Sequence, residues 1–513
     1  MVKSIPLKGR TMNTKKGIYN IASGLATQLI SMALGLIVPR LFLLSFGSGV
    51  NGMLVSISQI FQYFALLEAG VGLAALQALY GPVARDDTKS INQIMAATDK
   101  YYKRTGLMYF AAVLFFSALF PMFTDTPISF GEVTLVILLQ GMGNVVSYLF
   151  QGKFRILLQA EGKNYILSNL ATVINILTNV SKIALIMLGF NVIAIQVAFF
   201  LLSLSQMLYI MFYIRRHYPW INLKVEPDLK SVAQKDYVLL HQISGLVFSS
   251  TDAIILGQFC GFNVVSIWSV YTMLTAIVLG VMDTVCNGIR FHLGQKFNTD
   301  MKRFTVLQDT FETYYIALTF ILYTALYLFI IPFVRLYTHG VEDISYVDPL
   351  LPPLMILNTL LTSGRLASNQ VINFAGEFKN TKNSSLIETG INLVVSLVLV
   401  QFIGIYGVLL GTIFALLYRA NYMISYANKK ILKRSPKATY RRLFINFGIF
   451  LVSIICFTGI FYNLDSYLKI VLWGGLSLIV LSCVYLAVNS FFEPEAYGLA
   501  KRKLLSVFNL RKA

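Results

Sequence analysis

The sequence predicts an all-α, polytopic membrane protein with about fourteen transmembrane helices. The chain of 513 residues is 56% hydrophobic and only 13% charged, whereas about a quarter of the residues in soluble domains are charged. Its mean hydropathy is +0.68. Its apolar residues fall into long runs, and a helix needs about 20 such residues to cross a bilayer. These observations exclude a soluble enzyme, a disordered chain and a secreted disulfide-rich scaffold.

The apolar runs follow one another along the whole chain. Several are longer than a bilayer requires, so we expect the helices to tilt or to project from it. We place the spans at residues 17–44, 50–84, 105–122, 131–151, 165–188, 192–214, 236–259, 263–290, 310–337, 349–375, 383–402, 405–428, 443–462 and 468–490.

The order of the spans indicates an internal repeat. An offset of about 212–216 residues lays the first six spans on the seventh to twelfth, and brings the sequence AEGKN near the sequence AGEFKN. We therefore expect two six-helix lobes followed by two extra C-terminal helices. The predicted boundaries are 1–215 for the N-terminal lobe, 216–235 for a cytoplasmic linker, 236–430 for the C-terminal lobe, and 431–513 for the last two helices and a cytoplasmic tail.

The basic residues predict the orientation of the chain. Fourteen spans place 36 of the 42 lysines and arginines on the side that holds both termini, and place Arg335 and Lys469 near the opposite surface. Basic residues concentrate in cytoplasmic loops, so we expect both termini in the cytoplasm. The net charge of +19 then reflects topology, and we expect no nucleic-acid partner.

The sequence contains no motif of an enzyme or of a metal site. P-loop, HExxH and GxSxG patterns are absent from it, and its four cysteines show no CxxC spacing. The predicted outer connections are at most about a dozen residues long, which leaves no room for an outer domain. We expect a protein that is not an enzyme, uses no cofactor or metal, and acts within the bilayer.

Charged residues inside the spans are candidates for function, because a charge at mid-bilayer costs at least about 2.5–3.5 kcal/mol. Cationic side chains, and arginine above all, suit the oxygens of a phosphate group. Acidic side chains in the same spans can pair with the bases or couple transport to an ion. The candidate substrate-binding residues are Arg40, Lys182, Arg365, Arg419 and Arg290, and the candidate coupling or charge-pairing residues are Glu68, Asp252, Asp283 and Glu388.

Four spans carry polar residues at helical spacing, on one helix face each. A polar stripe facing lipid would be very costly, so these faces are expected to turn inward. They either bond packed helices together or line a cavity between the lobes, in which the charges pair only in part and leave a positive excess. The stripes are Ser168, Thr172, Asn175, Asn179 and Lys182; Asn358, Thr362, Arg365, Asn369 and Asn373; Gln140, Asn144, Ser147 and Gln151; and Asp283, Asn287 and Arg290.

Residues 39–94 resemble the first two helices of the Wzx-type polysaccharide flippases. The likeness consists of Arg40 near the end of helix one, the FG…G turn at Phe46–Gly47 and Gly52, and the LLE-x-G-x-G-x-A segment at 66–74. Of the candidate cationic residues, only Arg40 matches a motif position. The AEGKN loop and the plan of two lobes plus two helices extend the likeness over the whole chain.

This resemblance implies the fold of the multidrug/oligosaccharidyl-lipid/polysaccharide exporter superfamily. Two six-helix lobes would then enclose a cavity that opens to each side of the membrane in turn. The implied substrate is a polyprenyl-diphosphate-linked oligosaccharide, moved from the cytoplasmic to the outer leaflet of the bacterial cytoplasmic membrane. Other polysaccharide-assembly proteins are then candidate partners.

Two other functions are compatible with parts of the sequence. A multidrug cation antiporter of the same superfamily would use acidic residues such as Asp252 and Asp283, but helix one has Arg40 and no carboxylate. A membrane glycosyltransferase or polymerase would need a large outer loop, which the predicted topology lacks. The sequence therefore favours an anionic substrate and a flippase.

Overall fold

A computed structural model describes residues 14–68, 71–229 and 236–509, and within these ranges the chain is helical with no β-strand. Eleven of the helices are long and apolar enough to cross a membrane, which confirms an all-α, polytopic membrane protein. Helix α8 (Asp236–Phe259) is not among these eleven, and neither is the broken pair α11–α12 (Leu351–Gly364 and Leu366–Phe374). The count of fourteen therefore stays a prediction.

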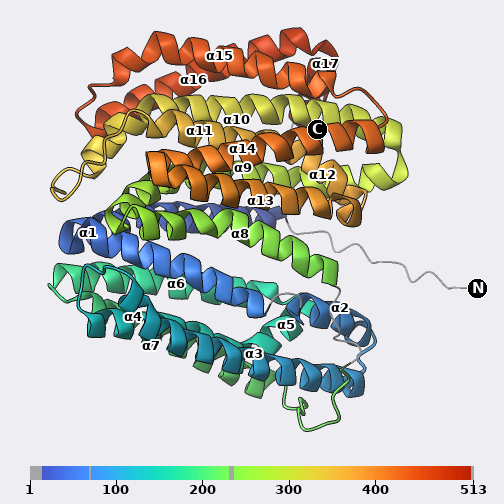
Figure 1. Ribbon diagram of the computed structural model, residues 1–513. Helices are drawn as coiled ribbons and strands as arrows, with labels where there is room; N and C mark the ends of the chain where they lie inside the picture. Colours follow the sequence, from blue (N-terminus) through green and yellow to red (C-terminus); the bar gives the residue numbers. More distant parts are fainter. Residues whose placement is uncertain (1–13, 69–70, 230–235, 510–513) are drawn as a thin grey trace, which may run out of the picture.

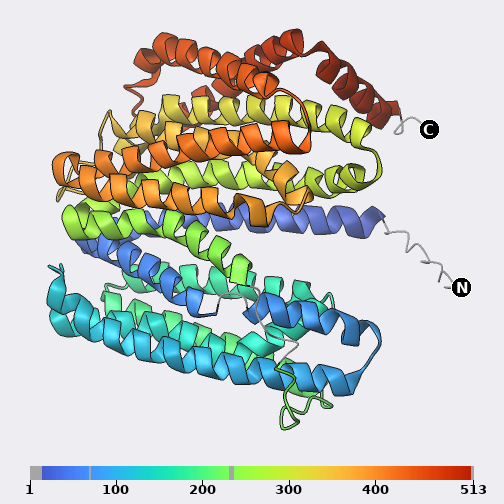
Figure 2. The same ribbon diagram turned by 45° about the vertical axis from the view of Figure 1, so that its right-hand side comes forward.

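The first helix, α1 (Thr14–Phe64), consists of two arms joined by a sharp reversal at Gly47. The backbone φ of Gly47 is +79°, a value that glycine adopts without the strain that a Cβ would cause. Figure 2 shows the two arms meeting at one end of the bundle. This reversal lies in the predicted outer connection between the first two spans.

The second arm of α1 leads into the rest of the N-terminal half. A short 3₁₀ turn (Ala65–Leu67) follows it, and three of the later helices, α3, α4 and α7, begin at polar caps that satisfy free amides. Asp87 and Asn191 each accept a backbone N–H, and Ser129 forms a capping box with Glu132. The helices are α2 (Val71–Ala84), α3 (Thr88–Phe123), α4 (Phe130–Val146), α5 (Gly152–Ala160), α6 (Asn164–Met187) and α7 (Val192–His217).

The C-terminal half is built around one largely buried helix, α10 (Met301–Tyr337). Helices α13 and α14 pack closely against each other, because Gly407 and Gly411 of α14 let its backbone approach Leu399 and Ser396 of α13. The other helices are α9 (Phe262–Thr299), α13 (Phe378–Ile403), α14 (Ile405–Tyr426), α15 (Lys437–Phe461), α16 (Tyr467–Phe492) and α17 (Pro494–Asn509).

The two halves form separate groups of helices that meet along α1 (Figure 1). The second arm of α1 packs against α8 and α9, and the approach is closest at Gly52, where a Cβ would overlap the carbonyl oxygen of Phe262. Helices α15–α17 lie on the far side of the C-terminal half, against α10. Residues 1–13, 69–70, 230–235 and 510–513 of the predicted domains lie outside the described ranges, and the predicted boundaries stay a prediction.

Candidate functional site

Two arginines share one glutamate in the C-terminal half. Arg365 lies at the break between α11 and α12, and its Nη1 is 2.5 Å from Oε1 of Glu388 on α13. Nε of Arg419 on α14 is 3.3 Å from Oε2 of the same carboxylate. Arg419 also donates hydrogen bonds to the Ser384 hydroxyl and to the Thr381 carbonyl. Within the described ranges no second carboxylate contacts either arginine, so this triad carries an excess of one positive charge.

The members of the triad differ in how far a ligand can reach them. The Arg365 side chain is 16% exposed, whereas those of Arg419 and Glu388 are 6% and 8% exposed. Arg365 is also the triad member on a polar stripe, and the five residues of that stripe are all half-buried. The geometry therefore suits a site in which Arg365 contacts an anion while Glu388 and Arg419 hold it in place.

Asp252 on α8 lies in a buried cluster of oxygen atoms beside α13 and α14. Its Oδ2 accepts a hydrogen bond from the Thr412 hydroxyl at 3.2 Å, and Asn392 donates to that hydroxyl at 2.9 Å. Oδ1 of Asp252 and Oδ1 of Asn392 are buried without a hydrogen-bond donor among the described residues. Ser396 donates to the Val408 carbonyl in the same interface. A buried carboxylate with a free oxygen is a site for a proton or for a monovalent cation bound by carboxylate, amide and carbonyl oxygens.

Arg40 lies apart from the triad, on the first arm of α1. Its Nη1 donates to the hydroxyl of Tyr467 at 2.5 Å, and its Cζ is 5.8 Å from the centre of that ring. Arg40 is seven residues, or about 10 Å, from the reversal at Gly47, and Tyr467 begins α16. The structure therefore places Arg40 near the end of the molecule where the chain reverses. No carboxylate contacts it among the described residues.

Among the described residues, the polar stripe on α6 forms no hydrogen bond to a neighbouring helix. Thr172 donates to the carbonyl of Ser168, and Asn179 donates to the carbonyl and the amide oxygen of Asn175, all within α6. Lys182 is half-buried and has neither an ion pair nor a hydrogen bond with any residue that the structure describes. These contacts argue against a role in joining helices and favour a stripe that faces water or a ligand.

The stripe on α4 behaves in the opposite way. Gln140 donates to Ser58 of α1 at 2.9 Å, and Asn144 donates to Tyr109 of α3 at 2.8 Å. Their amides join packed helices, as polar groups in membrane proteins often do. We therefore assign this stripe a structural role.

The remaining predicted residues are not brought together with the triad. Glu68 follows the 3₁₀ turn after α1 and accepts a hydrogen bond from Tyr102 of α3. Asp283, Asn287 and Arg290 on α9 are exposed, with no hydrogen bond or ion pair to another described residue. The predicted acids and bases thus pair only at Glu388.

A second buried charge cluster was not predicted from the sequence. Arg442 at the start of α15 is 2.5 Å from Glu312 and 2.8 Å from Asp309 on α10, and 3.2 Å from Glu493 at the end of α16. Glu312 lies inside the ninth predicted span, so its charge in an apolar run was the available signal. The cluster fastens α15 and α16 to α10 and has equal numbers of acids and bases once Arg434 and Arg441 are included.

The two halves are also joined by hydrogen bonds beside the reversal in α1. Asp343, in the loop after α10, accepts hydrogen bonds from the Ser48 backbone N–H at 2.6 Å and from its hydroxyl at 2.7 Å. Tyr346 donates to Ser48 and to Ser266 of α9, at 2.6 and 2.8 Å, in alternative hydroxyl orientations. The halves are therefore held together at the end where the predicted topology places the outer loops.

Comparison with solved structures places this architecture among membrane transporters. The chain aligns with "Lipid II flippase MurJ, inward closed conformation" at a TM-score of 0.69 and 14% identity, over 92% of this chain and 98% of that one. It also aligns with a multidrug resistance MATE family transporter of the MOP superfamily. The inward-facing form of that transporter gives a TM-score of 0.59 and 15% identity over 78% and 95% of the two chains, and its outward-facing form gives 0.54 and 15% over 80% and 94%. No protein-family model and no curated protein matches the sequence.

These similarities establish the fold of the chain. The chain has the fold of the MOP-superfamily transporters, and its apolar helices make it a multi-pass membrane protein. The similar structures are titled as a transporter and a flippase.

Proposed function

We propose that the protein is a flippase that moves polyprenyl-diphosphate-linked oligosaccharide from the cytoplasmic to the outer leaflet of a bacterial membrane. The observation that carries this proposal is the triad, in which one carboxylate serves two arginines and leaves a positive excess next to a polar stripe. An uncompensated charge in a membrane interior is costly, so an anion is the natural ligand. Arg365 offers the planar fork that binds phosphate oxygens.

The fold supports alternating access as the mechanism. Its halves are joined beside Ser48 and Asp343, while the polar face of α9 at Asp283–Arg290 is exposed. An inward-facing state would have this asymmetry, and two of the similar structures are titled inward-facing or inward closed. The diphosphate would enter from the cytoplasmic side, displace water from Arg365, and leave when the contacts at Ser48 separate.

The orientation is part of the proposal. Both termini would lie in the cytoplasm, because 36 basic residues fall on that side. A reporter fused at Lys433 should be active only when the reporter works in the cytoplasm. A fusion active on the outer side would contradict the whole topology.

A deletion strain tests the function directly. Lipid-linked oligosaccharide should accumulate in the inner leaflet, surface polysaccharide should disappear, and the wild-type chain supplied on a plasmid should restore both. Surface polysaccharide that persists without accumulation of the lipid intermediate would rule the function out.

A multidrug cation antiporter is the second candidate, and Asp252 is the observation that favours it. A buried carboxylate with a free oxygen is the kind of group that exchanges a proton for an organic cation. The deletion strain would then become sensitive to cationic dyes while its surface polysaccharide stays normal. The same strain thus distinguishes the two functions.

A further inference from the structure

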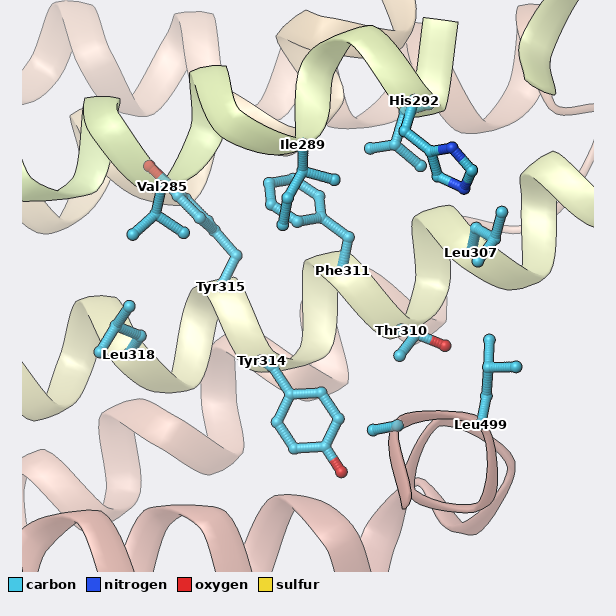
Figure 3. A pocket seen from close by; sticks show the side chains of 12 residues that line it. Val285, Ile289, His292, Leu307, Thr310, Phe311, Tyr314, Tyr315, Leu318 and Leu499 are labelled. Atoms are coloured by element: carbon cyan, nitrogen blue, oxygen red, sulfur yellow. The ribbon is translucent and has the colours of Figure 1, made fainter. Parts of the chain in front are cut away.

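An apolar groove lies on the flank of the C-terminal half, between α9, α10 and α17 (Figure 3). Its volume is about 360 Å³. His292, Leu307 and Leu499 lie toward one end of it, and Val285 and Leu318 lie toward the other. Neither the triad nor the Asp252 cluster contributes to its lining.

The shape and lining of the groove suit a hydrocarbon chain. The walls extend over about 10 Å from Val285 to His292 and about 16 Å from Leu307 to Leu318, at 1.5 Å per residue. The Tyr314 hydroxyl is engaged with Ser490 at 3.2 Å, and Thr310 donates to a carbonyl of its own helix. Few polar groups therefore remain to bind a polar solute, and an extended acyl chain is the better occupant.

Basic residues surround the end of the groove at His292. Lys501 and Arg502 follow the lining residue Ala500 on α17 and are exposed. Lys296 and Arg303 lie on α9 and α10 within four residues of lining positions. Of the nearby acids, Glu493 is paired with Arg441 and Arg442, which leaves Asp300, the cap of α10, and Glu495 against these four bases. This end of the groove would attract an anionic headgroup.

Helix α9 separates the groove from the predicted transport path. Val285, Ile289 and His292 line the groove, whereas the polar stripe that begins at Asp283 and ends at Arg290 is displaced from them by two residues. Two residues correspond to about 200° around a helix, so Asp283 and Asn287 lie on the face opposite to these three positions, whereas Arg290 is three residues from the lining residue Leu293. The groove is therefore lined by a different face of α9 from most of the stripe.

We propose that the groove binds an anionic phospholipid of the surrounding bilayer, which is retained and not transported. One acyl chain lies along α9 and α10, and the phosphate lies on Lys501 and Arg502. The lipid fills the space under α17 and so holds that helix against α10. This proposal depends on the cytoplasmic position of α17 and not on the identity of the transported substrate.

Native mass spectrometry of the purified full-length protein tests the site, with dioleoyl phosphatidylglycerol and dioleoyl phosphatidylcholine as probes. We expect roughly tenfold tighter binding of phosphatidylglycerol, because two bases contact its headgroup. Ala500→Trp and Ile289→Trp fill the groove from two different walls, and each should remove most of the bound lipid. The double variant Lys501→Ala/Arg502→Ala should lose the preference for phosphatidylglycerol and keep the weaker binding of phosphatidylcholine.

Matched controls are available on other surfaces. Ala111→Trp adds the same side chain at an exposed position of α3, and Lys429→Ala/Lys430→Ala removes two exposed bases near the end of α14; both should bind lipid like the wild type. Unchanged binding in both groove variants would overturn the proposal, as would an equal loss in the charge control. Undecaprenyl phosphate distinguishes the other source: if it displaces phosphatidylglycerol one for one, or if Arg290→Ala abolishes binding, the groove belongs to the transported lipid.

Discussion

Glu388 is the only carboxylate that contacts Arg365 within the described part of the chain, and it is bound to Arg419 at the same time. Arg365 approaches it from the break between α11 and α12, and Arg419 approaches from α14. The two arginines therefore depend on the glutamate for neutralisation, but the glutamate does not depend on either arginine alone. Removing each of the three should have a different consequence.

Arg365→Ala should reduce export and leave the protein folded. Glu388 keeps Arg419 as a partner, so no buried charge loses all compensation, while the group that binds phosphate is lost. We expect at least about a tenfold fall in surface polysaccharide, since hydrogen bonds to a charged group contribute about 1.5–3 kcal/mol, measured at equal protein abundance. Arg365→Lys should restore part of it, because the charge stays and the fork is lost. Full export by Arg365→Ala would rule out the proposal that Arg365 binds the substrate.

Glu388→Gln should instead destabilise the protein. The buried Arg419 and the half-buried Arg365 would then lack a carboxylate, and removing one partner of a buried ion pair costs about 3–5 kcal/mol. We expect a lower thermal transition of the purified protein in detergent. Asp465→Asn, which breaks an exposed ion pair with Lys469, is the control and should leave the transition unchanged. An unchanged transition in Glu388→Gln would show that the triad is not a structural unit.

Arg40 can be tested through its partner on α16. If Arg40 binds the substrate, Arg40→Ala lowers export, whereas Tyr467→Phe keeps the aromatic ring beneath the guanidinium and leaves export near the wild-type level. Quantification of surface polysaccharide in the two strains checks this expectation. Equal defects in both variants would assign Arg40 to the anchoring of α16 and not to the substrate.

Asp252→Asn should uncouple transport from an ion gradient. The amide is neutral and close in size, so the cluster with Thr412 and Asn392 should stay folded, but it can no longer take up a proton or a cation. In proteoliposomes, translocation of a labelled lipid-linked oligosaccharide should lose its response to an imposed proton or sodium gradient. Thr412→Val removes the hydroxyl that donates to Asp252 and accepts from Asn392 but keeps the carboxylate, and should weaken the response less. A variant Asp252→Asn that responds normally would exclude this cluster from coupling.

The attachment of the C-terminal helices should be sensitive to acid. Burial raises the pKa of Glu493, but hydrogen bonds from Arg442 and Arg441 outweigh it and hold the pKa below the ordinary value of 4.5. A carboxylate whose pKa is lower in the folded state than in the unfolded state stabilises the folded state at pH values above its unfolded pKa. This stabilisation is lost as the pH falls through the folded pKa. Amide exchange in α17, corrected for the intrinsic rate, should accelerate below about pH 4.5. Glu493→Gln should exchange faster already at neutral pH and show little further change.

The sequence predicted the helices better than the contacts between them. Apolar runs sufficed for an all-α polytopic membrane protein and for a connection between residues 44 and 50, where the chain reverses, because both depend on local composition. Arg365, Arg419 and Glu388 were each predicted as functional, yet their meeting was not, since it depends on the packing of four helix segments. The partner of Arg40 lies 427 residues away, and no spacing rule connects the two.

The second buried cluster shows a different limit. Arg442 precedes an apolar run by one residue and therefore resembled an exposed loop residue. In the folded chain it is 3% exposed, because α10 brings Glu312 to the same depth. The sequence does not show whether a charged residue at a helix end is solvated or buried in an ion pair. That depends on which helix packs beside it.

Gly52 brings the backbones of the two halves into direct contact near the reversal. Its missing side chain lets the backbone of α1 rest directly on that of α9 at Phe262, so the two halves touch there with nothing compressible between them. Any larger residue at position 52 would clash with Phe262 and push the two halves apart at this end, against the hydrogen bonds at Ser48. In the proposed transport cycle, Gly52 would thus set the equilibrium between the inward-open and outward-open states without contacting the substrate.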